Sequence, residues 1–283
     1  MEIRSLSGTN PDAIFEAFDR AFADYEVQNN KKQLQAMLKR RGFNPGLSFA
    51  AFDQNEIVAF TFNGVGSFNG MQTAYDTGTG TIKEFRGMGL ATNIFEYSIP
   101  YLKEAGIRQY LLEVLQHNNK AVSVYSKLGF EVTREFNYFI QQNSGIKNAV
   151  KDTDFPYLVR PIDGSDYDIV SAFWDFPPSW QNSFESVQRA TGSFISLGVF
   201  DGENLAGYCI FEPSSGDITQ LAVDKNYRRK GIASLLLHEM VKRNKYDSVK
   251  VLNTDINCDS ITAFLKSKNI DIKGRQFEMI RKL

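Results

Sequence analysis

The chain has 283 residues, 42% of them hydrophobic and 23% charged, and a formal net charge of −1. This length favours two domains, and the near-zero net charge argues against nucleic acid as a partner. The two cysteines and two histidines are scattered along the sequence, so we expect neither a disulfide framework nor a metal site. The first residues lack an apolar leader, and no stretch has the length of a membrane span, which predicts a cytoplasmic protein without membrane partners.

The first half of the chain predicts a helix, followed by strands that alternate with further helices. Asn10 and Pro11 suit the start of a helix whose apolar residues between Ile14 and Phe22 share one face. A later helix has an apolar face made of Leu90, Ile94, Phe95, Ser98 and Leu102. In chain order, we expect strands over 47–53, 56–65 and 73–81, the helix from Leu90, a strand over 109–116, a short helix from about 119 and a strand over 131–140.

The second half of the chain repeats this order. The sequence EFRGMGLA at 84–91 returns as NYRRKGIA at 226–233, an offset of 142 residues. A period of half the chain indicates two copies of one domain. We therefore predict two α+β domains in tandem, over 1–145 and 156–283, joined by a polar linker at 146–155. The elements expected in the second copy are strands over 193–200, 205–212 and 217–223, a helix from Ile232, a strand over 248–255, a short helix from about 258 and a strand over 271–280.

The repeated loop has two possible uses. As a dinucleotide fingerprint, Gly87-x-Gly89 would need a third small residue at 92, where Thr92 stands. The pattern shared by both copies is instead Arg-x-x-Gly-x-Ala between a strand and a helix, where backbone N–H groups and the helix dipole can bind a pyrophosphate. The pattern resembles the acetyl-CoA loop of the GNAT superfamily of N-acetyltransferases. The resemblance implies two tandem GNAT domains, each a mixed, mostly antiparallel twisted sheet flanked by helices.

The resemblance also implies which residues hold acetyl-CoA. In this family the strand before the loop pairs with the pantetheine arm, and the loop N–H groups hold the pyrophosphate. The positions implied in the first copy are Gly80, Thr81, Ile82, Arg86, Gly87, Met88, Gly89, Leu90, Ala91, Thr92 and Asn118. Those implied in the second copy are Ala222, Val223, Asp224, Arg228, Arg229, Lys230, Gly231, Ile232, Ala233 and Ser234.

A second segment, NNKAVSVYSKLGF at 118–130, carries the candidate acid. It resembles the family segment Asn-x-x-Ala-Ile-x-Leu-Tyr-x-x-x-Gly-Phe, which implies that Tyr125 protonates the departing CoA thiolate. A tyrosine carries its proton at neutral pH, so the chemistry is reasonable. A core tyrosine on an amphipathic helix is the alternative.

Two carboxylates are candidates for the base. Glu113 interrupts an apolar strand, where an unpaired charge would be costly, so it should face a cleft or solvent. Its position resembles that of the general base in the ribosomal-protein alanine acetyltransferases. Asp76, in the strand before the loop, is the other candidate, and a water could connect either one to the amine. Alternatively, Glu113 pairs with a nearby lysine or arginine.

The second copy departs from this pattern, because Phe264 aligns with Tyr125 and Leu252 with Glu113. We therefore expect catalysis in the first copy, with acetyl transfer from acetyl-CoA to a primary amine of a small molecule or a peptide N-terminus. Two alternatives remain: catalysis in the second copy, as in mycothiol synthase, or an acyl-CoA-binding regulatory protein without turnover. The segment 174–184, which contains both tryptophans, is either a packed turn or an aromatic lip over a substrate.

Overall fold

The structure is a computed structural model that describes residues 1–24, 30–147, 156–164 and 167–283. Residues 148–155 of the predicted linker therefore lie outside the described residues. The chain forms two compact units. Unit 1 comprises Met1–Thr133, Gln188–Ala190 and Phe277–Leu283, and unit 2 comprises Arg134–Val187 and Thr191–Gln276.

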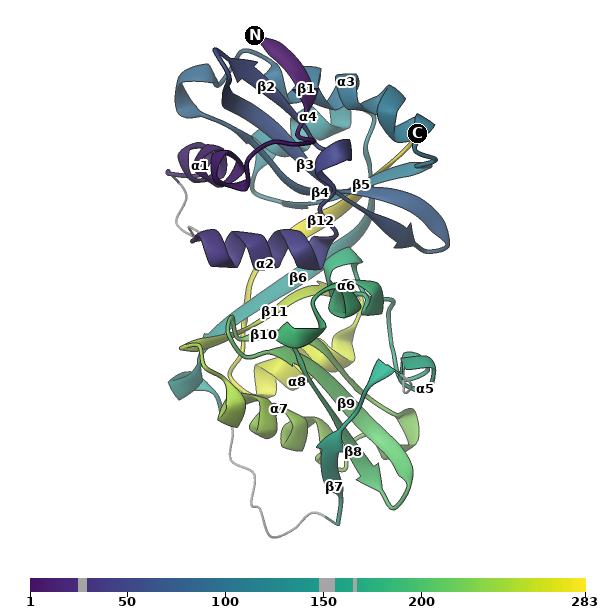
Figure 1. The fold of residues 1–283 in the computed structure, drawn as a ribbon. Helices are drawn as coiled ribbons and strands as arrows, with labels where there is room; N and C mark the ends of the chain where they lie inside the picture. Colours follow the sequence, from purple (N-terminus) through teal and green to yellow (C-terminus); the bar gives the residue numbers. More distant parts are fainter. Residues whose placement is uncertain (25–29, 148–155, 165–166) are drawn as a thin grey trace. The chain divides into compact units, whose positions relative to one another are not determined.

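Unit 1 is built on a mixed sheet with strand order β1-β2-β3-β4-β5-β12 (Figure 1). The pairs from β1 to β4 are antiparallel, and β4 and β5 are parallel. The strands are β1 (Glu2–Ser5), β2 (Phe49–Asp53), β3 (Glu56–Phe68), β4 (Met71–Thr81), β5 (Gln109–Leu115) and β12 (Ile272–Lys282). The helices are α1 (Pro11–Ala21), α2 (Lys31–Arg41), α3 (Leu90–Glu104) and α4 (Asn119–Lys127).

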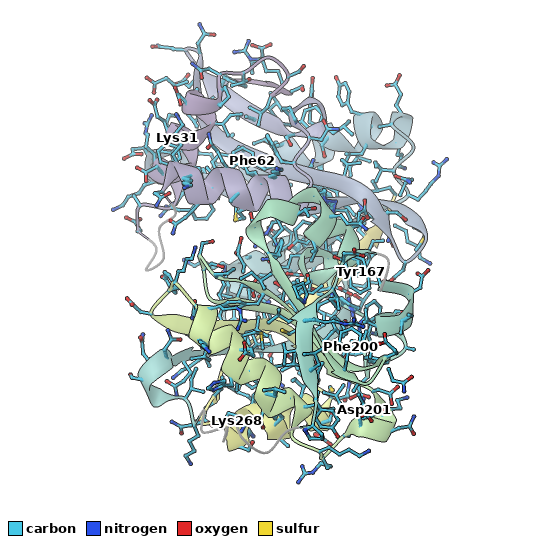
Figure 2. The ribbon with its side chains drawn as sticks, turned by 60° about the horizontal axis from the view of Figure 1, so that its bottom comes forward. Lys31, Phe62, Tyr167, Phe200, Asp201 and Lys268 are labelled. Atoms are coloured by element: carbon cyan, nitrogen blue, oxygen red, sulfur yellow. The ribbon has the colours of Figure 1, made fainter. Side chains whose placement is uncertain are left out.

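The helices of unit 1 bury the faces that their sequences predict. Asn10 caps α1 by accepting a hydrogen bond from the backbone N–H of Asp12, and Pro11 occupies the first helical position. The core contains stacked phenylalanines, with the rings of Phe60 and Phe62 at a centroid distance of 4.1 Å. Figure 2 labels Phe62 among the side chains of unit 1. The buried residues of α3 are Leu90, Ile94, Phe95, Ser98 and Leu102, which confirms the predicted apolar face.

Unit 2 repeats the arrangement, with strand order β6-β11-β10-β9-β8-β7. Here too, the strand before the loop, β10, lies parallel to its next neighbour, β11. The strands are β6 (Glu131–Gln142), β7 (Leu158–Pro161), β8 (Ile195–Asp201), β9 (Asn204–Glu212), β10 (Asp217–Val223) and β11 (Ser248–Asp255). The helices are α5 (Tyr167–Ser171), α6 (Phe184–Arg189), α7 (Ile232–Arg243) and α8 (Asp259–Ser267).

The closing strand of each copy completes the sheet of the other copy. In β6, Phe136–Gln142 pairs antiparallel with β11, and Phe139 is fully buried in the core of unit 2. Met279 of β12 is 1% exposed and packs in the core of unit 1 with Phe95 and Leu112. The predicted domain bounds follow the repeat in the sequence, whereas the two units follow contacts in space. The two divisions therefore differ at these strands.

Every helix and strand predicted from the repeat is present, within two or three residues of its expected bounds. The strands β1 and β7 and the helices α2, α5 and α6 were not predicted. The mixed sheets flanked by helices agree with the predicted fold class.

Candidate active site

The two central strands of each unit separate, which opens the sheet at its middle. The parallel pairing of β4 with β5 runs from Thr73 to Tyr75, while β4 keeps its pairing with β3 as far as Thr81. In unit 2 the corresponding parallel contact joins Asp217 to Lys250. The end of β4 thus has one paired edge and one edge that faces the opening. An extended ligand could bind along that edge through backbone hydrogen bonds.

A bulge marks the point where the strands separate. In unit 1 the register with β3 shifts between Asp76 and Gly78, which leaves Thr77 as the extra residue. Arg41 of α2 donates a hydrogen bond to the Thr77 carbonyl oxygen at 3.0 Å. In unit 2 the same shift makes Thr219 the extra residue. Because the offset is again 142, Ile218 is the structural counterpart of Asp76.

Both repeated loops have the same backbone conformation. Gly87 and Gly89 have φ of 82° and 74°, and Arg229 and Gly231 have φ of 64° and 86°. Gly89 and Gly231 immediately precede α3 and α7, and neither helix start has a side-chain cap. A Cβ added at either glycine of the first loop would meet nothing within 4 Å. The loop therefore presents bare backbone and uncapped helical N–H groups to open space, which fits a phosphate ligand.

The arginine of the repeated motif holds the loop in place. Arg86 donates to the carbonyl oxygens of Thr81 (3.2 Å) and Ala21 (3.0 Å) and forms an ion pair with Asp24 at 2.9 Å. Arg228 of unit 2 makes the equivalent contacts. It donates to the carbonyl oxygens of Val223 and Phe173 and pairs with Asp175. These guanidinium groups already contact protein acceptors, so a phosphate ligand at either loop would bind to the backbone N–H groups.

Asp76 and Tyr125 meet beside the opening in unit 1. The Tyr125 hydroxyl donates to Oδ2 of Asp76 at 3.0 Å, and the Thr79 hydroxyl donates to the same oxygen at 2.8 Å. The backbone N–H of Gly78 donates to Oδ1 at 2.9 Å. Burial raises the pKa of Asp76 above 3.8, because desolvation outweighs these hydrogen bonds and the nearby positive charge of Arg41.

Glu113 has a different partner. Its Oε2 accepts a hydrogen bond from the Tyr75 hydroxyl at 3.1 Å. Burial, followed by the nearby negative charge of Glu113, raises the pKa of Tyr75 well above 10. The structure therefore brings Asp76 within hydrogen-bonding distance of Tyr125, and Glu113 within hydrogen-bonding distance of Tyr75. Asn118 caps α4, the helix that carries Tyr125, by accepting from the N–H of Ala121 at 3.2 Å.

The remaining positions assigned to the coenzyme lie on the strand ends and loops. Gly80 and Thr81 are in β4, and the N–H of Ile82 donates to the Val58 carbonyl oxygen. Arg41 and Thr79, which contact the site, were not identified from the sequence. The helix of Arg41 does have a signal that was overlooked, a capping box formed by Asn30 and Gln33.

The structure corrects the alignment of the second copy by one residue. The segments after α4 and α8 close with equivalent hydrogen bonds, from Phe130 N–H to the Tyr125 carbonyl and from Ile270 N–H to the Leu265 carbonyl. Leu265 is therefore the counterpart of Tyr125, and Phe264 is its neighbour. The shift arises because β11 contains one more residue than its counterpart β5. This residue lies near Asn253, which has φ of 58° where the register between β11 and β6 breaks.

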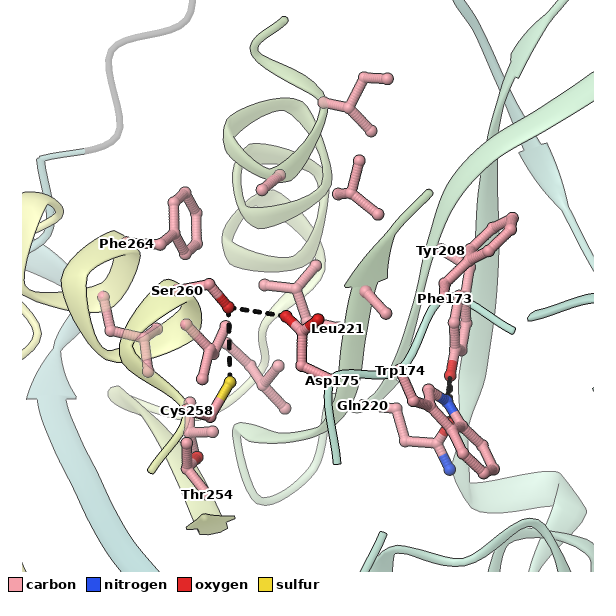
Figure 3. A pocket seen from close by; sticks show the side chains of 18 of the residues that line it. Phe173, Trp174, Asp175, Tyr208, Gln220, Leu221, Thr254, Cys258, Ser260 and Phe264 are labelled. Atoms are coloured by element: carbon pink, nitrogen blue, oxygen red, sulfur yellow. Dashed lines mark hydrogen bonds between the residues drawn. The ribbon is translucent and has the colours of Figure 1, made fainter. Parts of the chain in front are cut away.

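Unit 2 contains a cavity of about 560 Å³ between β10, β11, α7 and α8 (Figure 3). The segment 174–184 both packs and lines this cavity. Trp180 is 1% exposed, and Trp174 lines the wall, where its Nε1 donates to the Tyr208 hydroxyl at 2.6 Å. Trp180 therefore agrees with the packed turn, whereas a role of Trp174 as a lip over a substrate stays a prediction.

Among the described residues, no group of three or more His, Cys, Asp or Glu side chains is arranged to hold a metal ion. Nor does the described part of the chain contain a helix long and apolar enough to cross a membrane.

Several curated proteins have similar sequences. The chain is 29% identical over 98 residues to N-alpha-acetyltransferase 30 of Schizosaccharomyces pombe, which covers 34% of this chain and 65% of that protein. It is 28% identical over 132 residues to a mycothiol acetyltransferase of Amycolatopsis mediterranei, which covers 44% of each. The chain thus matches about half to two thirds of the length of these relatives.

Solved structures share the fold over nearly the whole chain. A tandem GNAT protein from the clavulanic acid biosynthesis pathway superposes with a TM-score of 0.76 at 10% identity, covering 99% of this chain and 98% of that one. A GCN5-related N-acetyltransferase from Sphaerobacter thermophilus gives a TM-score of 0.70 at 15% identity, with coverage of 99% and 95%. The model of the acetyltransferase (GNAT) family matches residues 12–130 and 166–259. Since these two regions span most of the chain and one lies in each copy, the chain belongs to the acetyltransferase (GNAT) family.

Proposed function

We propose that the protein is an N-acetyltransferase that moves an acetyl group from acetyl-CoA to a primary amine, with its catalytic centre in unit 1. The observation that carries this proposal is the hydrogen bond between Tyr125 and Asp76 beside the opening between β4 and β5. Family membership supports the reaction class and the acyl donor.

The coenzyme site is assigned to the loop of unit 1 and the end of β4. The bare backbone of Gly87 and Gly89 and the uncapped start of α3 suit the pyrophosphate. The edge of β4 that does not pair with β5 beyond Tyr75 suits the amide groups of pantetheine. Bound there, acetyl-CoA supplies an activated acetyl thioester.

The pair of side chains can move the protons that the reaction requires. Asp76 accepts the proton that the amine loses as its nitrogen bonds to the acetyl carbon, directly or through one water. Tyr125 donates its hydroxyl proton to the sulfur as the carbon–sulfur bond breaks. The protonated Asp76 then returns a proton to Tyr125 across their 3.0 Å hydrogen bond. Both groups thereby regain their starting states, and the raised pKa of Asp76 favours its role as a temporary proton carrier.

The acceptor is proposed to be a free amine on a small molecule or a peptide N-terminus. Two of the similar proteins are named N-alpha-acetyltransferases, which favours the peptide N-terminus. Unit 2 has Ile218 and Leu265 at the positions of Asp76 and Tyr125, and neither side chain can transfer a proton. This difference favours unit 1 as the catalytic centre.

The test is release of CoA thiol from acetyl-CoA across a panel of small amines and peptides with free N-termini. With an acceptor that supports turnover, Tyr125→Phe should lower kcat about 10²-fold or more, with little change in the KM for acetyl-CoA. Tyr97→Phe, an exposed tyrosine on α3, is the matched control and should retain the wild-type rate. Wild-type turnover by the Tyr125→Phe protein would exclude Tyr125 as the acid.

A further inference from the structure

The cavity of unit 2 has a predominantly apolar wall. The apolar contributions come from both sides of the opening, with Leu221 on β10 and Phe264 on α8 (Figure 3). Other apolar residues of the wall are Phe173, Pro178, Ile218, Ala222, Ile232, Val251, Ile261 and Leu265. A volume of about 560 Å³ is within the range of small-molecule sites.

Several polar side chains of the wall are held by hydrogen bonds to other residues of the wall. The Tyr208 hydroxyl donates to Oε1 of Gln220 at 2.6 Å, and Nε2 of Gln220 donates to the Asn182 carbonyl oxygen at 2.6 Å. Asp175 accepts a hydrogen bond from Ser260 at 2.8 Å (Figure 3). It also accepts one from Arg228 at 2.9 Å. These contacts fix the positions of the bonded polar groups, while most of the exposed surface of the wall is apolar.

The cavity also extends to the repeated loop of unit 2. Arg229, Gly231 and the first residues of α7 line its mouth, and the loop has the same backbone conformation as its counterpart in unit 1. Where unit 1 has Gly87 and Met88, this loop has Arg229 and Lys230, which add positive charge for an anionic ligand. Ile218 and Leu265, which stand at the positions of the proposed proton-transfer pair of unit 1, also line the cavity.

We propose that unit 2 is a binding site without turnover for coenzyme A thioesters whose acyl chain is longer than acetyl. The loop binds the phosphates, and the apolar wall beyond it binds the chain. This role concerns a different unit from the proposed acetyl transfer and does not depend on it. Each methylene buried against the wall should raise the affinity about fourfold, so hexanoyl-CoA should bind up to about 10²-fold more tightly than acetyl-CoA.

The experiment is a calorimetric titration of the full chain with CoA, acetyl-CoA and hexanoyl-CoA. Gly89→Glu places a negative charge in the loop of unit 1, so this variant reports on unit 2. Two further variants test the wall: Leu221→Glu introduces a charge, and Leu221→Met is the matched control that preserves an apolar side chain of similar volume. Thermal melts establish that each variant is folded.

We expect the Gly89→Glu protein to bind one hexanoyl-CoA, at least tenfold more tightly than acetyl-CoA, and to release no CoA from it. In the otherwise wild-type chain, Leu221→Glu should remove the tight site, whereas Leu221→Met should keep it. Equal affinities for the three ligands, or tight binding that survives in Leu221→Glu, would overturn the assignment of the wall. Hydrolysis or transfer of the hexanoyl group by the Gly89→Glu protein would overturn the absence of turnover. Neither result would bear on the effect of Tyr125→Phe in unit 1.

Discussion

The Tyr125 hydroxyl donates a hydrogen bond of 3.0 Å to Oδ2 of Asp76, although the two residues are 49 positions apart in the sequence. Asp76 belongs to the strand before the proposed coenzyme loop, and Tyr125 belongs to the helix after the next strand. Their contact joins the proposed acid to one of the two candidate bases.

The activity should depend on pH through the carboxyl group of Asp76. Asp76 must be ionised to accept a proton, and burial raises its pKa above 3.8, so kcat/KM should rise with pH through that raised pKa. The hydrogen bond from Tyr125 lowers the pKa of Asp76, so Tyr125→Phe should move the rising limb to higher pH in addition to lowering the rate. A pH–rate profile of both proteins measures this. If the rising limb of kcat/KM lies at the same pH in both proteins, a group other than Asp76 controls this limb.

The two candidate bases should differ in the effect of removing their charge. Asp76→Asn should lower kcat by about 10²- to 10⁴-fold, because the amide cannot accept the amine proton. Glu113→Gln should lower kcat less than about tenfold, because an amide oxygen can still accept the hydrogen bond from the Tyr75 hydroxyl. Steady-state kinetics of both variants give the comparison, and the reverse order of effects would assign the base to Glu113.

Gly89→Ala should separate coenzyme binding from stability. Its φ of 74° makes any side chain unfavourable, at a cost of about 1–2 kcal/mol, yet the added Cβ would meet nothing within 4 Å. The new methyl group does point into the space proposed for the pyrophosphate. We therefore expect a modest loss of Tm together with a rise of about tenfold or more in the KM for acetyl-CoA.

Gly70 provides the control for this variant. It has φ of 75° in the turn between β3 and β4, and a Cβ there also meets nothing within 4 Å. Gly70→Ala should lower Tm by a similar amount and leave the KM unchanged. Equal KM values for the two variants would contradict the loop as the coenzyme site.

Met279→Ala should destabilise unit 1, although this residue belongs to the second copy in the sequence. Met279 is 1% exposed in the core of unit 1, and removing such a side chain costs about 2–5 kcal/mol. Amide hydrogen exchange should therefore accelerate in β5. The matched variant is Met240→Ala, in the core of unit 2, which should accelerate exchange in β11. If Met279→Ala instead accelerates amide hydrogen exchange in β11, the placement of β12 in the core of unit 1 is wrong.

Local patterns in the sequence predicted the elements, but not which sheet each strand joins. The face of α3 from Leu90 to Leu102 follows from a period of 3.6 residues, which is a property of the segment alone. Phe139 and Met279 would satisfy the same apolar pattern in either sheet, because the two copies offer similar neighbouring strands. No local sequence pattern therefore indicates that β6 joins the sheet of unit 2 and that β12 joins the sheet of unit 1.

The candidate site was predicted in part for a similar reason. Asp76 and Tyr125 were both identified, but their contact depends on the bulge at Thr77 and on the register of α4. The one-residue error at Phe264 arose from the extra residue at Asn253, which shifts the sequence of the second copy between two otherwise matching segments.

The position of residues 277–283 in unit 1 also affects how the chain folds during synthesis. Domains usually fold in order as they leave the ribosome. Here, the first unit lacks its last strand until the ribosome has translated the whole of the second. A nascent chain that stops short of Phe277 contains every residue of the proposed proton-transfer pair and of its coenzyme loop, yet lacks a strand of the sheet that supports them. Activity in unit 1 should therefore report that translation has passed through both copies.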